Sequence, residues 1–244
     1  MLMRIERPSN GRRQHSALEE LGVSQAQEKI KVLLVDDHTL FRQGVRALLQ
    51  THRDIEVVGE AWNGKEALAE AIKLRPDVII MDIAMPIMNG IEATCQICKQ
   101  VKGTKVLVLT THAYEENILE LMEMGAYGYL FKDAEAGELL LAIRKVHHGH
   151  SYLSPSLSAK SIQEYLRRSR VRKASKNGLL SSREREVLQL VAEGYSNRQV
   201  GELLFISPKT VEAHKASIIH KLDIKGGAEL VKYAVVRGLV DVET

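Results

Sequence analysis

The sequence predicts an α/β domain with a doubly wound parallel sheet, followed by an all-α domain of four helices. Three observations support this division. Residues 30–150 alternate short apolar runs with amphipathic helical segments, residues 179–244 show helical patterns only, and residues 151–178 show neither pattern. Regular alternation of strands and helices is typical of βαβ units in a parallel sheet. A length of 244 residues fits two modest domains.

Five strands are predicted in the first region, each followed by a helix. Their apolar residues are consecutive, as expected for strands that helices cover on both faces. Right-handed crossovers then produce a (βα)5 sheet with the flavodoxin-like strand order 2-1-3-4-5. The predicted strands are residues 30–37, 55–61, 77–82, 105–111 and 126–132, and the predicted helices are residues 38–50, 64–74, 90–101, 114–125 and 135–149.

The remaining segments differ in charge and polarity. Residues 1–29 are polar and contain a Pro-Ser-Asn-Gly turn cluster, which predicts a disordered extension. Residues 151–178 carry 7 Lys/Arg against 1 Asp/Glu and form a basic linker. This linker separates residues 30–150, with 13 Lys/Arg and 17 Asp/Glu, from residues 179–244, with 9 of each. The two domains are therefore distinct electrostatic units.

Residues 179–244 have the layout of a helix-turn-helix, with helices predicted at 181–194, 196–205, 207–224 and 226–239. Ser207 and Pro208 are favourable cap and first-turn residues for the third helix. Its apolar face lies opposite a polar stripe with small residues near the middle, which permits close approach to a DNA major groove. An ordinary bundle helix gives the same pattern, and the residues leave both interpretations open. The face comprises Val211, Ile218 and Leu222, and the stripe Lys209, Glu212, Ala213, Ala216 and His220.

Two further features exclude other classes of protein. No run approaches the roughly 18 apolar residues that a membrane span needs, and the N-terminus lacks a signal-peptide core, so we expect a cytoplasmic protein without membrane insertion. The two cysteines, Cys95 and Cys98, lie in a predicted helix. A zinc site would need a second pair of ligands, so these thiols are interpreted as small packed side chains.

Polar residues stand at the carboxyl ends of the predicted strands, where parallel sheets bind ligands. Strands one and three are neighbours in the predicted order, so Asp36, Asp37 and Asp82 should converge. Three adjacent carboxylates require a cation, and oxygen ligands at such a place suit Mg²⁺. Thr110 and Lys132 would meet the other oxygens of a phosphoryl group on Asp82, which makes Asp82 a nucleophile. The alternative is that these five residues are unrelated caps and surface groups.

Residues 30–148 resemble the receiver domain of bacterial two-component response regulators. The matching segments are LLVDDH, IIMDIAMPIMNG, VLVLTT and GAYGYLFKD. The resemblance implies that Asp82 accepts a phosphoryl group from a sensor histidine kinase and that Thr110 and Tyr129 are switch residues beside the phosphate-pairing Lys132. It also implies Mg²⁺ as cofactor, held by Asp36, Asp37, Asp82 and the backbone carbonyl of Ala84. Asp133 replaces the proline that follows this lysine in many receivers.

Residues 179–240 resemble the LuxR-type DNA-binding domain, on the segment from Leu180 to Leu222. Both resemblances together indicate the NarL/FixJ family of response regulators. They imply phosphate contacts from Asn197, Arg198, Lys209, Thr210, Lys215 and Lys221, and base contacts from Glu212, Ala213 and Ala216 beside His220. They also imply a dimer contact on the fourth helix, at Glu229, Lys232, Tyr233 and Val236.

The sequence therefore predicts a transcriptional regulator that a sensor kinase phosphorylates on Asp82. Phosphorylation is expected to release the helix-turn-helix and to favour homodimers on paired promoter half-sites. We expect a phosphoacceptor that removes its own phosphoryl group rather than an enzyme with a substrate. Two alternatives stay open at this point. One is a DNA-binding protein with a vestigial receiver, and the other is a Mg²⁺-dependent phosphohydrolase with an aspartyl-phosphate intermediate.

Overall fold

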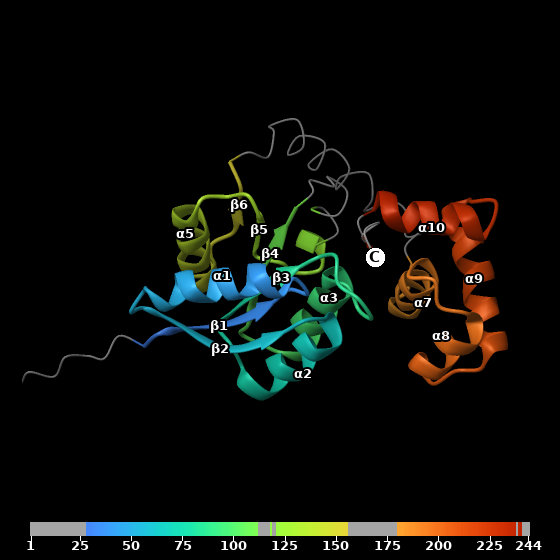
Figure 1. The fold of residues 1–244 in the computed structure, drawn as a ribbon, viewed down its shortest axis with the longest axis horizontal. Coiled ribbons are helices and arrows are strands. Elements are labelled where there is room, and N and C mark those ends of the chain that lie inside the picture. The colour runs from blue at the N-terminus through green and yellow to red at the C-terminus, as the bar shows by residue number, and fades with distance from the viewer. Residues whose placement is uncertain (1–27, 112–117, 119–120, 156–179, 238, 241–244) are drawn as a thin grey trace, which may run out of the picture.

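A computed structural model of the chain describes residues 28–111, 118, 121–155, 180–237 and 239–240. Figure 1 shows a sheet flanked by helices and, beside it, a group made of helices alone. The elements of the first group are β1 (Ile30–Val35), α1 (Thr39–Gln50), β2 (Ile55–Ala61), α2 (Gly64–Leu74), β3 (Val78–Asp82), α3 (Gly90–Gln100), β4 (Lys105–Thr110), β5 (Gly128–Phe131), α5 (Ala136–His147) and β6 (Tyr152–Leu153).

The strand order is β2-β1-β3-β4-β5-β6, and every neighbouring pair is parallel. This confirms the predicted order 2-1-3-4-5 and adds a sixth strand. The added strand begins in residues that the sequence assigned to the linker, and it is only two residues long. Its alternating pattern is too short to detect in a sequence. Register pairs Val35 with Met81, so the residues after β1 and β3 meet at one edge of the sheet.

Two hydrophobic clusters cover the two faces of the sheet. One places Leu33, Ile79 and Met81 against α2 and α3, and the other places Val32, Leu34 and Ile80 against α1 and α5. Successive strand residues thus serve opposite faces, which explains why apolar residues run consecutively in the sequence. Figure 1 shows α1 and α5 together on one side of the sheet.

Some predicted elements lie partly or wholly outside the described residues. The extension at residues 1–29 is described only at its last two residues, and the linker only before residue 156. The fourth helix predicted at residues 114–125 is described at Ile118 and residues 121–125, where Ile118 and 121–123 are helical. Ile118 and Leu121 are buried, as expected for a helix packed on the sheet.

The four C-terminal helices are α7 (Ser182–Ala192), α8 (Asn197–Leu204), α9 (Pro208–Leu222) and α10 (Gly227–Val236). This confirms the predicted four-helix domain. Ser181 and Ser196 form capping boxes, and the Ser207 hydroxyl accepts the Thr210 N–H ahead of the first-turn proline. Val211 and Ile218 of α9 are fully buried, as the predicted apolar face requires. Among the described residues, no helix is long and apolar enough to cross a lipid bilayer.

Candidate functional site

The carboxyl edge of the sheet gathers the predicted acidic residues around one lysine. Asp36 follows β1, Asp82 ends β3, and both side chains are buried. The ammonium Nζ of Lys132, directly after β5, lies 2.8 Å from Asp36 Oδ2 and 2.7 Å from Asp82 Oδ2. The backbone N–H of Ile83 donates to Asp82 Oδ1 at 2.8 Å. The parallel register of β1 and β3 therefore produces the predicted convergence.

Burial and charge shift the proton equilibria of this site in opposite directions. Burial raises the pKa of Asp82 to about 7, against the lowering effect of Lys132, and the neighbouring Asp36 raises it further. For Lys132, burial lowers the pKa, but the two carboxylates outweigh it and the net pKa is raised. Lys132 therefore keeps its positive charge at pH 7. A pKa of about 7 leaves the Asp82 carboxyl group about half protonated at that pH.

The donor set fits a hard divalent cation. Oxygen atoms of Asp36, Asp37 and Asp82 and a ring nitrogen of His38 lie within 4.8 Å of one another. One oxygen of Asp37 is buried without a hydrogen bond, although His38 Nδ1 lies 2.9 Å away. Burial raises the pKa of Asp37. A cation would satisfy this oxygen and offset the charge, and a set of carboxylate oxygens suits Mg²⁺.

The two predicted switch residues occupy neighbouring strands. Thr110 ends β4, is buried, and pairs in register with Phe131 of β5. Its carbonyl accepts the N–H of Lys132 at 2.8 Å, which ties β4 to the lysine's backbone. Tyr129 is fully buried and meets Phe131 edge-on, with ring centroids 5.8 Å apart. Tyr129 is therefore an inward-facing core residue in this conformation.

A tight loop connects Asp82 to α3. Gly90 begins this helix, and its N–H donates to the Ile83 carbonyl at 2.8 Å. A side chain on Gly90 would overlap the backbone carbonyl of Asp82. Ile87 adopts φ 70°, a left-handed conformation that is unfavourable for a β-branched residue. The loop is thus strained and closely fitted, and it fixes the end of β3 where Asp82 lies.

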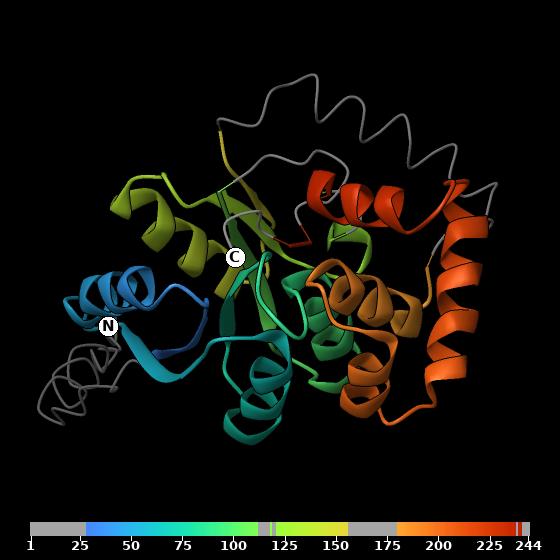
Figure 2. The same cartoon turned by 45° about the vertical axis from the view of Figure 1, so that its right-hand side comes forward.

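The polar stripe of α9 is exposed along its length. Lys209, Thr210, Glu212, Ala213, Ala216 and His220 are exposed, and Lys215 is half-buried. In Figures 1 and 2, α9 lies on the side of its domain away from the sheet. The sheet domain therefore leaves this stripe open. A helix with small residues on an open polar face is suited to a major groove.

Two comparisons of parts of the chain agree with this division. Residues 32–144 match the family of response regulator receiver domains. Residues 178–234 match the family of bacterial regulatory proteins of the luxR type. The chain is 40% identical over 216 residues to the oxygen regulatory protein NreC of Staphylococcus haemolyticus, covering 87% of this chain and 100% of that protein. The chain belongs to the LuxR-type response regulators.

Other relatives of this response regulator agree. The transcriptional regulatory protein LiaR of Bacillus subtilis is 41% identical over 209 residues, covering 84% of this chain and 96% of LiaR. A LuxR-family two-component response regulator from Aurantimonas has a solved structure with 32% identity and a TM-score of 0.52, covering 59% of this chain and 99% of that one. The response regulator RcsB of Salmonella typhimurium shares the fold, with a TM-score of 0.60, 24% identity and coverage of 88% and 100%.

Several polar side chains of the DNA-binding domain bind one another. Asn197 of α8 donates to Glu212 at 3.3 Å and accepts from Lys215 at 3.1 Å. The carboxylate of Glu212 is thus held by an amide. Lys221 donates to Glu184 of α7 at 2.6 Å, so its ammonium is engaged inside the domain. Arg198 pairs with Glu202 on the surface.

The last helix of the response regulator carries the residues predicted for a dimer contact. Val236 is 59% exposed, and Val231 is also partly exposed on α10. Lys232 and Glu229 are exposed, and the Glu229 carboxylate accepts the N–H of Lys225 at 2.7 Å. Tyr233 is half-buried and lies beneath the Arg237 guanidinium, 5.1 Å from ring centroid to Cζ. The helix therefore presents apolar side chains beside charged ones.

Residues that the sequence did not reveal also surround the acidic site. Arg42 of α1 donates to the Asp36 carbonyl at 2.5 Å and to Glu60 of β2 at 2.8 Å. The ring of Phe41 lies under Lys132, with Nζ 4.9 Å from the centroid. His38 follows the two aspartates directly. All three fall within six residues of Asp36, and that proximity is the only signal that could have found them.

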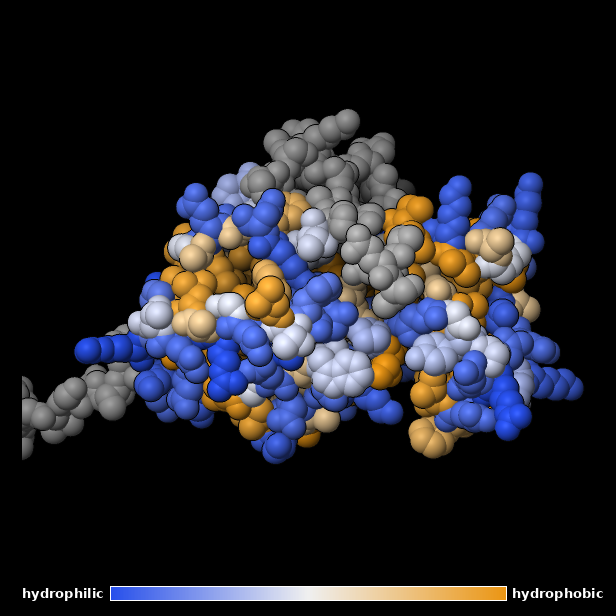
Figure 3. Space-filling view, viewed as in Figure 1, coloured by the Kyte–Doolittle hydropathy of each residue, from blue (hydrophilic) through white to orange (hydrophobic). Residues whose placement is uncertain are grey.

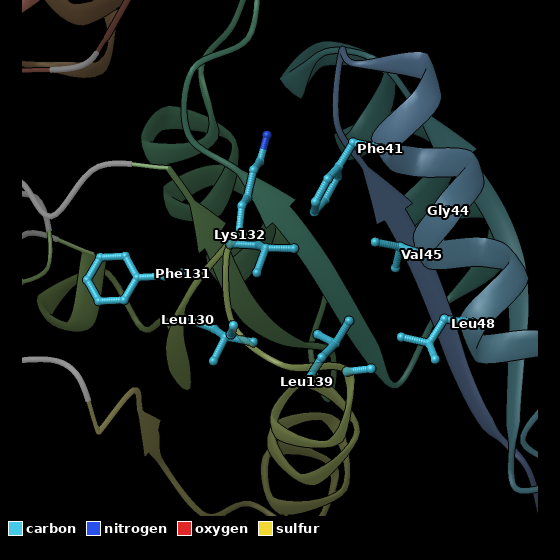
Figure 4. A pocket seen from close by; sticks show the side chains of 11 residues that line it. Phe41, Gly44, Val45, Leu48, Leu130, Phe131, Lys132 and Leu139 are labelled. Carbon is cyan, nitrogen blue, oxygen red and sulfur yellow. The ribbon is translucent and has the colours of Figure 1, made fainter.

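A hollow of about 240 Å³ lies beside this lysine between α1 and α5. Figure 4 shows Phe41, Val45 and Leu48 facing Leu139 across it, with the Lys132 ammonium pointing away from its apolar floor. Hydrophobic side chains also gather on the outer surface around α1 and α5 in Figure 3. Most residues that line the hollow are apolar and none is acidic, but Lys132 lines it too, so the hollow adjoins the carboxylate site.

Replacing Asp82 by asparagine should make the protein more stable at pH 8 when EDTA removes divalent cations. The folded-state pKa of about 7 lies above the ordinary 3.8, so the stability that the protonated Asp82 carboxyl contributes is lost as pH rises from about 3.8 through about 7. Asparagine stays neutral, so the difference should shrink towards pH 5. Thermal unfolding from pH 5 to 8 measures it, and a constant difference across this range contradicts the expectation.

Proposed function

We propose that this response regulator controls transcription through phosphorylation of Asp82 by a sensor histidine kinase. The observation that carries the proposal is Lys132, whose ammonium joins Asp36 and Asp82 at the carboxyl edge of the sheet. Residues 30–150 serve as the receiver, residues 151–178 as the linker and residues 179–244 as the DNA-binding domain. Residues 1–29 are an extension. The regulator works in the cytoplasm.

The phosphoryl transfer is a displacement at phosphorus. A carboxylate oxygen of Asp82 attacks the phosphohistidine of the kinase, a P–O bond forms, and the P–N bond breaks with its electrons returning to the imidazole. Lys132 pairs with the phosphoryl oxygens, and Thr110 supplies a hydroxyl at the end of β4. Asp36, Asp37, Asp82 and the Ala84 carbonyl would hold Mg²⁺, which would supply positive charge against the roughly two negative charges gained. In autodephosphorylation a water molecule then attacks the phosphorus, the P–O bond to Asp82 breaks with its electrons returning to the carboxylate, and inorganic phosphate leaves.

The readout combines a switch in the receiver with a change in the DNA-binding domain. Movement of Thr110 towards the phosphoryl oxygens leaves space for the ring of Tyr129, which is now buried. Release of the helix-turn-helix follows, and the α10 surface at Glu229, Lys232, Tyr233 and Val236 joins two copies. The exposed stripe of α9 favours control by misplacement of the domain over a covered recognition helix.

DNA recognition uses both sides of the helix-turn-helix. Lys209, Thr210, Lys215, Asn197 and Arg198 contact phosphates, and Glu212, Ala213 and Ala216 approach base edges with His220 beside them. Lys221 contributes less to phosphate binding than a free lysine, since Glu184 holds it. Double-stranded promoter DNA with paired half-sites suits a symmetric dimer of this kind.

The proposal is tested by incubating the full chain with Mg²⁺ and acetyl phosphate beside Asp82→Asn. Phosphate-affinity electrophoresis should retard the wild type alone, gel filtration should show its dimerisation, and its DNA affinity should rise at least tenfold. Phosphorylation of the wild type without any change in DNA affinity supports a vestigial receiver. Catalytic turnover of a phosphate ester supports the phosphohydrolase alternative, whereas stoichiometric labelling opposes it.

A further inference from the structure

The DNA-binding domain binds the loop that follows Asp82. The amide of Gln189, on α7, accepts the Asn89 N–H at 2.8 Å and donates to the Met85 carbonyl at 2.7 Å. Gln189 and Asn89 are each 1% exposed. A buried amide whose two ends bind two backbone groups of another domain fixes both the position and the spacing of those groups.

Two neighbouring side chains of the DNA-binding domain add further contacts with the sheet domain. Glu193, one turn after Gln189, accepts the N–H of the strained Ile87 at 3.2 Å and the amide of Gln189 at 2.7 Å. Arg185, one turn before, forms an ion pair at 2.7 Å with Glu92 of α3, which is 1% exposed. One face of α7 thus binds the loop from Met85 to Asn89 at its beginning, middle and end.

The loop is short and rigidly linked to Asp82. Met85 lies three residues beyond Asp82 and directly after Ala84, the residue whose carbonyl is proposed to hold Mg²⁺. The side chain of Asn89 caps α3 through the Glu92 N–H at 2.9 Å, and Gly90 is fitted against Ile83. Only a few covalent bonds separate Ala84 from the Met85 carbonyl. A displacement of the backbone at Asp82 or Ala84 therefore also moves the groups that Gln189 binds.

We propose that Gln189, acting from the DNA-binding domain, restrains the Met85–Asn89 loop and thereby slows phosphoryl transfer to Asp82. This rests on the proposed function, in which phosphorylation releases that domain. Coupling between two equilibria is reciprocal, so a domain that phosphorylation releases must disfavour the phosphorylated state while it is docked. The rate is affected as well where the loop has to shift before Asp82 can react, because Gln189 holds both of its ends. The contact made by Gln189 then has two effects. It restrains the loop while the domain is docked, and it breaks when phosphorylation changes the conformation of the loop.

The test compares Gln189→Glu with wild type in the full chain. Glutamate has the same shape and still accepts the Asn89 N–H, but it lacks the donor for Met85 and faces Glu193 as a like charge. The expected result is a larger radius of gyration by small-angle X-ray scattering without phosphodonor. The initial rate of phosphorylation by acetyl phosphate should rise at least threefold, at a lower half-saturating Mg²⁺ concentration.

A second variant and a control separate this result from a general loss of structure. Glu92→Gln removes the ion pair with Arg185 but keeps the helix, and it should change scattering and rate in the same direction. Gln100→Glu makes the same chemical change at an exposed position of α3 and should behave as wild type. Circular dichroism verifies that all variants are folded.

The outcomes distinguish this inference from the proposed function. A wild type that takes up no phosphoryl group on Asp82 overturns the proposed function, and the inference with it. A wild type that is phosphorylated normally, beside a Gln189→Glu variant with an unchanged or slower rate, overturns only the inference. The inference fails in that case whether the variant expands or stays compact, since restraint of the loop requires both effects together.

Discussion

Replacing Gly90 by alanine is expected to destabilise the receiver by about 3 kcal/mol and to slow phosphorylation of Asp82 roughly a hundredfold. The new Cβ would overlap the backbone carbonyl of Asp82 and approach Ile83. Neither atom belongs to a flexible side chain, so the backbone at the end of β3 must move. That movement displaces the Asp82 carboxylate from the Lys132 ammonium, which lies 2.7 Å away in the wild type.

The matched control is Gly44→Ala in α1, where an added Cβ meets nothing within 4 Å. In the middle of a helix this change should stabilise the receiver by about 1 kcal/mol, because alanine is the better helix former. Urea unfolding gives both stabilities, and phosphate-affinity electrophoresis gives both rates. A Gly90→Ala protein with the stability and rate of wild type would show that the loop is looser than its contacts indicate.

Replacing Glu184 by glutamine should destabilise the DNA-binding domain by about 3 kcal/mol at pH 7. Burial raises the pKa of this carboxyl, but hydrogen bonds from Lys221, Ser217 and Ser181 outweigh it and lower the pKa to about 2 from 4.5. The carboxylate accepts from Ser217 at 2.7 Å, from Lys221 at 2.6 Å and from the Ser181 N–H at 2.7 Å. It therefore connects the start of α7 to the end of α9.

The pH dependence identifies the source of this stability. A lowered pKa contributes stability above about 4.5, and that stability is lost as pH falls towards about 2. Urea unfolding should thus show a wild-type advantage at pH 7 that narrows below pH 4.5. Glu202→Gln, which breaks an exposed pair with Arg198, is the control and should cost less than 1 kcal/mol. Equal losses in both variants would contradict the role given to Glu184.

The sequence was sufficient to predict the main architecture because the order of apolar and polar residues in each strand indicates which of its faces are buried. The consecutive apolar residues of β1 and β3 predict burial on both faces, and the strand order brings Asp36 and Asp82 together. The capping serines and Pro208 likewise predict where the C-terminal helices begin. These are local patterns with a fixed period or a fixed position, and such patterns can be recognised in the sequence alone.

The remaining contacts depend on how distant segments meet. Nothing near Gln189 indicates that its amide binds Met85 and Asn89, 104 and 100 residues away. The family resemblance implies that Lys221 binds a DNA phosphate, yet its ammonium lies 2.6 Å from the Glu184 carboxylate. Neither pairing follows a periodic pattern, and the position of a residue in the chain does not specify a partner that is distant in the sequence.

The position of the sixth strand limits the affinity that the two domains need for each other. It anchors the chain beside β5, where the Ser154 N–H donates to the Tyr129 carbonyl at 2.9 Å. Only 25 residues, 155–179, then separate this anchor from Leu180. A short covalent tether keeps the partner surface at an effective concentration in the millimolar range. An interface with millimolar intrinsic affinity would therefore be about half closed, and a coupling of about 1–3 kcal/mol would open it. A regulator built this way needs weak contacts, because contacts of nanomolar strength would hold it shut against any signal.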